Sequence, residues 1–244
     1  DIVLGKFPAV FSSKFNSDDR VYSDLMATSV FQRSQNSTRM RGVYMRHIRP
    51  VLDSQVFKNV RHRKLGDNTL TVHLRGGDIM NPKTAHPSFV QAPLSFFTKI
   101  ITEGRFQKVV VCSEYDQFNN PVVRSLVTYC QNLGVECDAS PRSVAEDMYI
   151  IANSKNLAVG GYTSFSRSLV LCAPDIRRIF VPRLNRLREP ELMITSFEGD
   201  RSVRVESYVF PEYFQSDSEW TASDEQKKRM IKYPAEKIKL HSIT

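Results

Sequence analysis

Several features common in proteins are scarce or missing in this chain. No hydrophobic run approaches the length of a transmembrane helix, which predicts a soluble domain with no stable membrane insertion. The 244 residues include four cysteines, which have no C-x-x-C spacing, and five histidines, which stand singly. Buried free thiols are therefore expected at Cys112, Cys130, Cys137 and Cys172, and a zinc site is not.

The common nucleotide and hydrolase signatures are also absent. The chain has no G-x-x-x-x-G-K-[ST] motif, and no G-x-G-x-x-G follows a strand-like segment. Neither a P-loop enzyme nor an ordinary NAD enzyme is therefore indicated. The absence of a G-x-S-x-G elbow argues against a hydrolase. No D-x-D lies between hydrophobic strands to hold a metal on a nucleotide sugar, so we expect no metal cofactor.

The formal net charge of +8 favours an acidic partner. Nucleic acid, a membrane surface and nucleotide or sugar phosphates all fit that description. The basic residues are spread along the chain, however, and their densest group is better explained as a solvated helix face and loop than as a nucleic-acid groove. That group comprises Arg39, Arg41, Arg46, Arg49, Arg61 and Arg63.

The first residue is Asp1 rather than Met, so we expect that an N-terminal piece is missing or was removed. The compartment stays open as a result. The chain fits a cytoplasmic protein, a viral one included, or a Golgi-lumen domain whose N-terminal anchor was removed.

Strand-like and helix-like segments alternate through the middle of the chain. Helix boundaries are indicated by Gly104 and Gly134 after two apolar runs and by a capping-box pattern from Ser143 to Glu146. Such alternation is typical of βαβ units, which predicts an α/β fold with a Rossmann-like parallel sheet and helices on both faces. The expected strands are 69–75, 108–112, 135–137, 157–160 and 178–181, and the expected helices are 93–103, 121–133, 143–154 and 164–172.

Three regions are expected on this basis. Residues 1–68 would be a reduced, partly helical N-terminal region on the acceptor side, with a strand within 2–11 and helix within 21–51. Residues 69–183 would be the Rossmann-like domain. Residues 184–244 would be a C-terminal extension packing back on it, with a strand at 203–210 and a charged helix after Ser223, which forms a second capping-box pattern with Gln226.

The stretch T-L-T-V-H-L-R-G-G-D, residues 69–78, joins a strand pattern to a polar turn. It would place the Arg75 cation, the backbone N–H groups of Gly76 and Gly77, and the Asp78 carboxylate at the carboxyl edge of the sheet. Ligands bind at that edge in open α/β sheets. The alternative is a glycine turn in which Arg75 and Asp78 merely pair with each other.

A second polar loop, G-G-Y-T-S at 160–164, precedes a predicted helix. Free N–H groups and the hydroxyls of Thr163 and Ser164 would converge at the positive end of the helix dipole, which is an anion site. Plain N-capping is the alternative. Asp147, early in its helix, could accept hydrogen bonds from a ribose or base, and His73 shares a strand face with Arg75.

These motifs resemble those of a known enzyme superfamily. H-L-R-G-G-D at 73–78 resembles the H-x-R-R-x-D motif of the inverting fucosyltransferases of GT-B type. The acidic pair Glu146-Asp147, the following A-N-S and the T-S-F-S at 163–166 resemble their second signature. S-E-Y-D at 113–116 is similar to their acidic turn after a strand, and 86–97 is similar to a segment of uncharacterised algal, fungal and viral sugar-transferase-like proteins. The resemblance covers 70–182, a little under half of the chain.

The resemblance implies a role for each matched residue. Arg75 would hold the donor β-phosphate, and Ser164, Phe165 and Ser166 would hold the phosphates from a helix N-terminus. His73 and Asp147 would contact the nucleoside. Asp78 is the candidate general base, with Glu114 and Asp116 as weaker candidates.

Two departures from the family pattern bear on the donor. Gly76 stands where the second arginine of H-x-R-R would help to bind the nucleotide, so GDP-fucose and a UDP-sugar such as UDP-xylose both remain open. The 68 residues before the domain leave room for only a reduced first half of a GT-B enzyme.

Two functions are expected from these observations. The first is a metal-independent, inverting glycosyltransferase that moves a sugar from a nucleotide-sugar donor to a hydroxyl of a glycan or glycoprotein acceptor, with no cofactor besides the donor substrate. The second is a non-catalytic protein that binds a nucleotide, an acidic glycan or nucleic acid.

Overall fold

The computed structural model describes residues 37–114, 120–161, 163–184, 193, 196–197, 200–214 and 220–243. The strand expected within 2–11 and the first part of the helix expected within 21–51 lie outside these residues, as does Asp116. The rest of the chain shows the α/β architecture that the alternation predicts.

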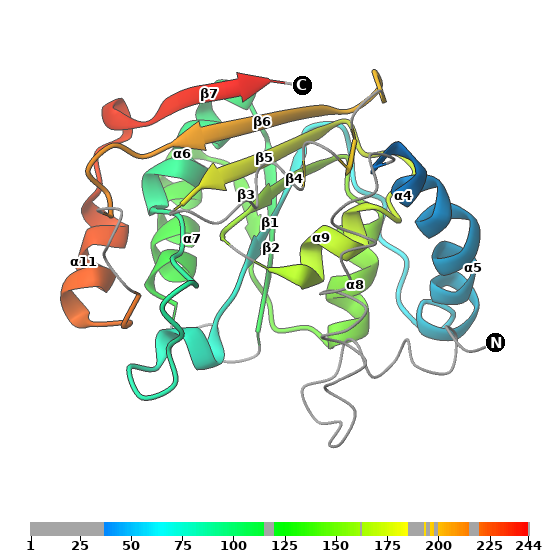
Figure 1. The fold of residues 1–244 in the computed structure, drawn as a ribbon, viewed down its shortest axis with the longest axis horizontal. Coiled ribbons are helices and arrows are strands. Elements are labelled where there is room, and N and C mark those ends of the chain that lie inside the picture. The colour runs from blue at the N-terminus through cyan, green and yellow to red at the C-terminus, as the bar shows by residue number, and fades with distance from the viewer. Residues whose placement is uncertain are drawn as a thin grey trace.

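A seven-stranded sheet forms the centre of the molecule (Figure 1). Its strand order is β3-β2-β1-β4-β5-β6-β7, and neighbouring strands are parallel except for the antiparallel pair β6–β7. The first six strands therefore follow the order 3-2-1-4-5-6 of the Rossmann fold. The strands are β1 (Thr69–Leu74), β2 (Lys108–Ser113), β3 (Glu136–Asp138), β4 (Asn156–Val159), β5 (Arg178–Arg183), β6 (Arg204–Val209) and β7 (Lys239–Ile243).

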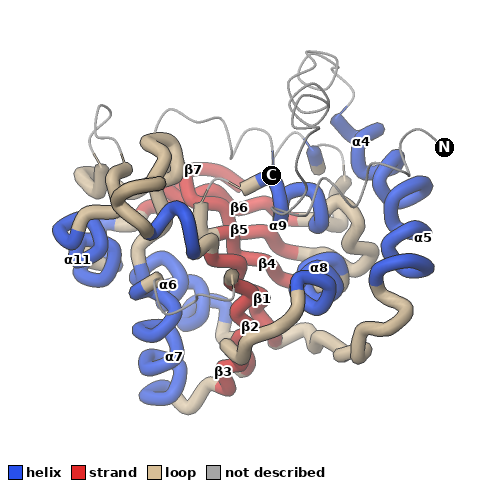
Figure 2. The backbone as a smooth tube through the Cα atoms, turned by 90° about the horizontal axis from the view of Figure 1, so that it is seen from below, coloured by secondary structure: helices blue, strands red, loops and turns tan. Residues whose placement is uncertain are grey.

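Helices cover both faces of the sheet (Figure 2), so the predicted fold class is confirmed. One face packs against α6 (Leu94–Gly104), α7 (Pro121–Leu133) and α11 (Asp224–Lys232). The other packs against α8 (Val144–Ala152), α9 (Ser164–Val170) and a helical segment at 37–56. That segment comprises α4 (Ser37–Val43), η2 (Tyr44–Ile48), α5 (Arg49–Val51) and η3 (Leu52–Val56). Two short 3₁₀ helices are η4 (Gly77–Met80) and η6 (Ala235–Lys237).

The side chains of β1 explain how the two cores form. Leu70, Val72 and Leu74 lie in the core under α6 and α7, whereas Thr71 and His73 point to the face of α8 and α9. All six residues of β1 are buried because the strand has a neighbour on each side and helices above and below.

The helical segment at 37–56 extends past the point where we expected it to stop. Pro50 cannot donate a backbone hydrogen bond, yet the chain stays helical to Val56. The turns on either side of Pro50, η2 and η3, are π-helical, which shifts the hydrogen bonding to the fifth residue along.

The predicted helix ends are confirmed in part. Gly134 ends α7 with a φ of 72°, and Ser143 and Glu146 form a reciprocal capping box at the start of α8. The helix expected to stop at Gly104 does end there, since Gly104 is the last residue of α6, but Arg105 rather than Gly104 takes the left-handed conformation, with a φ of 51°. A glycine is needed at position 104 because the Phe106 ring occupies the space that a Cβ would fill.

The C-terminal region adds to the same sheet. The expected strand appears as β6, but β7 was not predicted. Ser223 caps α11 as expected, although the Gln226 side chain accepts a hydrogen bond from the Thr221 backbone instead of closing a capping box.

Two residues before α11 donate hydrogen bonds to the loop that follows β1. Trp220 Nε1 donates a hydrogen bond of 2.6 Å to the Ile79 carbonyl, and the Tyr213 hydroxyl donates one of 3.0 Å to the Gln91 carbonyl. The C-terminal region thereby holds residues 79–91 across the carboxyl edge of the sheet. Among the described helices, none combines the length and apolarity needed to cross a membrane.

Candidate functional site

The strand order reverses between β1 and β4, and the predicted polar loops start from the carboxyl ends of these two strands. β1 runs into the turn at Arg75, and β4 runs into Gly160 and the start of α9. This is the position at which open α/β sheets bind ligands, because the two flanking connections diverge to opposite faces.

Arg75 is held at this edge by three contacts. Its Nη2 atom lies 2.9 Å from Asp78 Oδ2 and 3.2 Å from Oδ1, and its guanidinium lies 4.2 Å from the centre of the Phe89 ring. The Asn120 side chain donates a hydrogen bond of 2.8 Å to the Arg75 carbonyl. The ion pair considered as an alternative from the sequence is therefore present, and it keeps the guanidinium in place beside an aromatic ring.

The two glycines of this turn have different surroundings. Gly77 has a φ of 55°, and the Glu114 carboxylate overlaps the space that a Cβ on Gly77 would fill. Glu114, at the end of β2, thus lies directly against the backbone of the turn. Gly76 leads into η4, whose first turn contains Asp78. The structure therefore brings together Arg75, Gly76, Gly77, Asp78 and Glu114.

The other glycine pair does not form the open anion cradle that we expected. The Gly160 N–H donates to the His73 carbonyl at 2.8 Å, and the Gly160 carbonyl accepts from Ala92 N at 2.6 Å. A Cβ on Gly161 would lie 2.7 Å from the Val90 carbonyl. The prediction of a free N–H at Gly160 is therefore wrong. These glycines allow β1, β4 and residues 90–92 to approach closely.

The start of α9 combines a cap with a buried hydroxyl. The Thr163 side chain accepts a hydrogen bond of 3.2 Å from Phe165 N, so the predicted N-cap is present. Ser164 is the first residue of α9, and the Phe165 ring lies 5.4 Å from the His73 ring, centre to centre. Ser166 is fully buried, and its Oγ atom has no hydrogen-bond partner in the described part of the chain.

His73 is a buried, neutral imidazole. Its side chain lies under the Phe165 ring, and its Nδ1 atom has no hydrogen-bond partner among the described residues. Burial, and secondly the nearby Arg75 cation, lower the pKa of His73 to about 4. The ring is therefore uncharged at neutral pH and offers one donor and one acceptor nitrogen.

Asp147 lies in the first turn of α8. Burial raises the pKa of the Asp147 carboxyl to about 6, against the opposing effects of Arg142 and of a hydrogen bond with Cys112. Cys112 and His73 are register partners on β2 and β1. Asp147, Cys112 and His73 thus form a continuous buried cluster, and Asp147 Oδ1 has no hydrogen-bond partner within the described residues.

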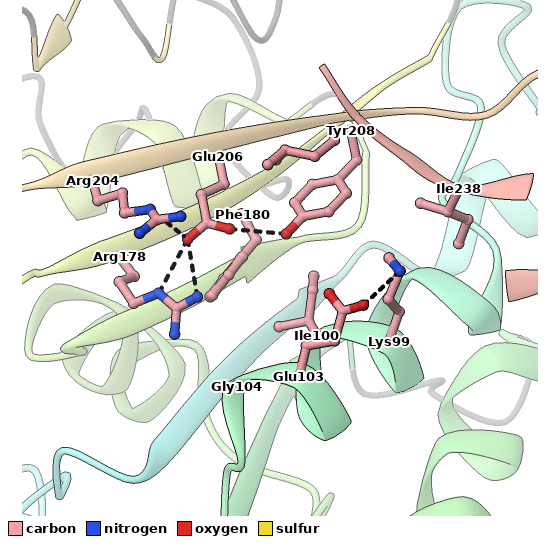
Figure 3. A pocket seen from close by; sticks show the side chains of 11 residues that line it. Lys99, Ile100, Glu103, Gly104, Arg178, Phe180, Arg204, Glu206, Tyr208 and Ile238 are labelled. Carbon is pink, nitrogen blue, oxygen red and sulfur yellow. Dashed lines mark hydrogen bonds and ion pairs between the residues drawn. The ribbon is translucent and has the colours of Figure 1, made fainter. Parts of the chain in front are cut away.

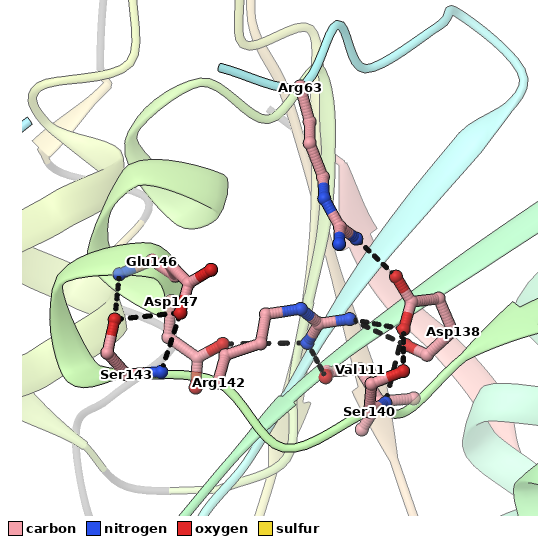
Figure 4. A network of polar contacts seen from close by, with 8 residues as sticks. All are labelled: Arg63, Val111, Asp138, Ser140, Arg142, Ser143, Glu146 and Asp147. Atoms are coloured by element: carbon pink, nitrogen blue, oxygen red, sulfur yellow. Dashed lines mark hydrogen bonds and ion pairs between the residues drawn. The ribbon is translucent and has the colours of Figure 1, made fainter. Parts of the chain in front are cut away.

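Arg142 is a buried cation that the sequence did not reveal (Figure 4). Its side chain is 4 % exposed, donates a hydrogen bond of 2.8 Å to the Val111 carbonyl and lies 2.7 Å from Asp138 Oδ1. Its Nη1 atom is 3.6 Å from Asp147 Oδ1. Burial would raise the pKa of Asp138, but hydrogen bonds from Arg142 and Ser140 hold it well below its usual value. In the sequence, Arg142 stands in an ordinary polar loop, S-P-R-S, with no signal of burial.

The fold and the site together define a Rossmann-like α/β protein with a polar site at the reversal of its strand order. No protein-family model matches the chain, and a search of curated proteins also finds no match. Across the described residues, no group of three His, Cys, Asp or Glu side chains is placed to hold a metal ion.

Proposed function

We propose that the protein is a metal-independent, inverting glycosyltransferase of GT-B type. Its donor would be a nucleotide sugar, either GDP-fucose or a UDP-sugar such as UDP-xylose, and its acceptor a hydroxyl of a glycan or glycoprotein. The observation that carries this proposal is a pair of buried polar atoms near the carboxyl ends of β1 and β4, His73 Nδ1 and Ser166 Oγ, which have no hydrogen-bond partner among the described residues. Buried polar atoms of native proteins usually have partners, so such a pair at a ligand-binding edge indicates groups that a ligand satisfies.

In this proposal the diphosphate of the donor binds between Arg75 and the start of α9. The guanidinium matches two phosphate oxygens, and the Ser164 and Ser166 hydroxyls add hydrogen bonds. His73 and Asp147 contact the nucleoside. Arg75 and the helix start then stabilise the charge that develops on the diphosphate as it leaves.

The ion pair between Arg75 and Asp78 would couple donor binding to release of the Asp78 carboxylate. Both contacts to Asp78 come from Nη2 of Arg75, so a phosphate oxygen that takes this nitrogen would separate Arg75 from Asp78. The released carboxylate can then take the proton of the acceptor hydroxyl as that hydroxyl attacks the anomeric carbon. Glu114, next to Gly77, is the alternative base.

The same ion pair also favours a second candidate, a nucleotide-binding protein without transferase activity. If Asp78 stays paired with Arg75, it has no catalytic role and only fixes the turn. Such a protein would bind the nucleotide and leave the donor intact.

A nucleotide-release assay distinguishes the two candidates. The wild-type chain, in excess chelator, is incubated with GDP-fucose or UDP-xylose and a glycan mixture, and the released nucleoside diphosphate is measured. We expect release by the wild type, loss of release in Arg75→Ala, and unchanged release in Arg46→Ala, which removes an exposed arginine of η2.

The variant Asp78→Asn tests the base. It keeps the shape and removes the basicity, so donor binding should persist while transfer falls by about a hundredfold or more. Donor binding with no release of nucleotide by the wild-type chain would favour the non-catalytic candidate.

A further inference from the structure

A polar cavity lies away from the carboxyl edge, between α6 and the strands β5, β6 and β7 (Figure 3). Its volume is about 350 Å³, which is at the lower end of the range for small-molecule sites. Arg178 and Arg204 line it, and each is the first residue of its strand. The cavity is therefore at the amino ends of these strands and shares no residue with the site at Arg75.

The strand register forces two cations together in this cavity. Arg178 and Arg204 are direct register partners on the parallel strands β5 and β6. Like charges at such positions repel each other unless an anion lies between them. Glu206 provides that anion, because its Oε1 atom lies 2.9 Å from Arg178 Nη2 and 3.0 Å from Arg204 Nε.

Both carboxylate oxygens of Glu206 have partners. Its side chain is only 4 % exposed, and its Oε2 atom accepts a hydrogen bond of 2.9 Å from the Tyr208 hydroxyl. Burial and the neighbouring carboxylate hold the pKa of Tyr208 above its usual value, so the phenol remains a donor. Glu206 consequently fixes both guanidinium groups but offers no free oxygen to a ligand.

The charges on the cavity wall do not balance. Lys99 and Glu103 of α6 neutralise each other across 2.6 Å. One carboxylate, Glu206, then faces the two arginines, which leaves one positive charge. Within the part of the chain that the structure describes, Nη1 of Arg178 and both Nη atoms of Arg204 have no hydrogen-bond partner.

Apolar side chains complete the wall. Ile100 and Phe180 line the interior, and Leu240, which is 46 % exposed, lies at the edge of the cavity. Ile100 and Phe180 are only 2 % and 1 % exposed, so Leu240 is the apolar side chain of this wall that a ligand can still cover. An anion that carries a small apolar body would gain from burying Leu240.

We propose that this cavity binds a small molecule with one oxyanion group, a carboxylate or a phosphate ester, attached to an apolar or aromatic body. The oxyanion lies against the free guanidinium atoms of Arg178 and Arg204, whose planar geometry suits two oxygens. The apolar body lies on Leu240. This proposal is independent of the proposed transferase activity.

The test is a titration of the ¹⁵N-labelled chain with benzoate and with phenyl phosphate, followed by NMR shifts of the β6 and β7 amides. Saturable shifts with either probe support the proposal, and the stronger probe identifies the oxyanion. Arg204→Gln should weaken binding about tenfold, the usual effect of losing a charged hydrogen bond. Arg204 is half exposed, so this change should leave the chain folded.

Two further variants complete the test. Lys99→Gln removes a cation from the opposite wall without touching Glu206 and should also weaken binding. Arg177→Gln is the matched control, because Arg177 precedes Arg178 but pairs with Asp67, outside the cavity. No saturable shift with either probe, or equal weakening in Arg177→Gln and Arg204→Gln, would overturn the proposal.

Discussion

At the scale of single residues, the account depends on a guanidinium held by weak contacts. The Arg75 and Asp78 side chains are 26 % and 53 % exposed, and exposed ion pairs contribute only about 0.2–1 kcal/mol to stability. Arg75 therefore does little for the fold. Under the proposed function, its place beside Phe89 and at the reversal of strand order serves to bind the ligand.

We expect Arg75→Ala to lose nucleotide binding while the free energy of unfolding falls by less than about 1 kcal/mol. Arg75→Lys should restore binding poorly, because an ammonium group lacks the planar fork that grips two oxygens. Calorimetry and urea unfolding measure the two effects. An Arg75→Ala chain that unfolds, or that binds nucleotide normally, would show that the ion pair with Asp78 is the whole role of Arg75.

Ser166→Ala should change stability and binding in opposite directions. The Ser166 hydroxyl is buried without a partner among the described residues, and such a group destabilises a protein by about 1–3 kcal/mol. Its removal should therefore raise the free energy of unfolding and weaken nucleotide binding by roughly fivefold to tenfold. Ser168→Ala, two residues along the same helix, is the control. Unchanged nucleotide affinity in Ser166→Ala would remove this hydroxyl from the site.

His73 and Asp147 should affect stability in opposite directions between pH 4 and 6.5. The pKa of His73 is lowered from 6.5 to about 4, so its contribution is present above pH 6.5 and is lost as the pH falls toward 4. The pKa of Asp147 is raised from 3.8 to about 6. Burying this carboxyl therefore costs no stability below pH 3.8, where it is neutral, and lowers the free energy of unfolding as the pH rises through 6. Each shift corresponds to about 3 kcal/mol.

Single variants should reveal how each group changes the dependence of the free energy of unfolding on pH. Relative to the wild type, Asp147→Asn should gain stability as the pH rises from 4 to 6.5, and His73→Phe should lose stability over the same range. Urea unfolding at a series of pH values measures both differences. Differences that do not change with pH would show that neither group titrates as the buried site requires.

At the scale of elements, local signals predicted most of the architecture. The βαβ alternation, the capping box at Ser143 and the helix end at Gly134 follow from short-range chemistry, and the structure confirms them. β7 was missed because K-L-H-S-I has no distinctive strand signal and pairs only through tertiary contact with β6. The π-helical turns around Pro50 were missed for a related reason, since packing on the sheet holds them.

The positions of the site residues were predicted to a similar extent. The sequence motifs correctly placed Arg75, Asp78 and Glu114 near one turn, because the carboxyl ends of parallel strands meet at one edge of the sheet. The buried ionic contacts of Arg142 depend on which loops fold over the strand ends, and no local pattern specifies that. The hydrogen bond from Gly160 to His73 was missed for the same reason.

Gly104→Ala tests whether packing against Phe106 requires a glycine at the end of α6. A Cβ at Gly104 would overlap the buried Phe106 ring, so we expect a loss of about 1–3 kcal/mol from overpacking. Gly42→Ala is the matched control, since Gly42 is also helical and a Cβ there has no neighbour within 4 Å. The control should be neutral or stabilising by up to about 1 kcal/mol. Equal effects of the two changes in thermal unfolding would refute the packing explanation.

At the scale of the whole molecule, the strand order places the two polar sites at opposite ends of one sheet. The carboxyl ends of β1 and β4 carry Arg75 and the buried cluster around His73, whereas the amino ends of β5 and β6 carry Arg178 and Arg204. Both sites present arginine, in keeping with a net charge of +8 and with acidic small molecules as ligands.

The most direct test of the central claim is calorimetric titration of the chain with GDP and with UDP in excess chelator. We predict that one of them binds at a single site, that Arg75→Ala weakens this binding at least about tenfold, the effect of a lost charged hydrogen bond, and that Arg204→Gln leaves it unchanged. Absence of binding by both nucleotides, or binding that Arg75→Ala leaves intact, would contradict a nucleotide site at the carboxyl edge of the sheet.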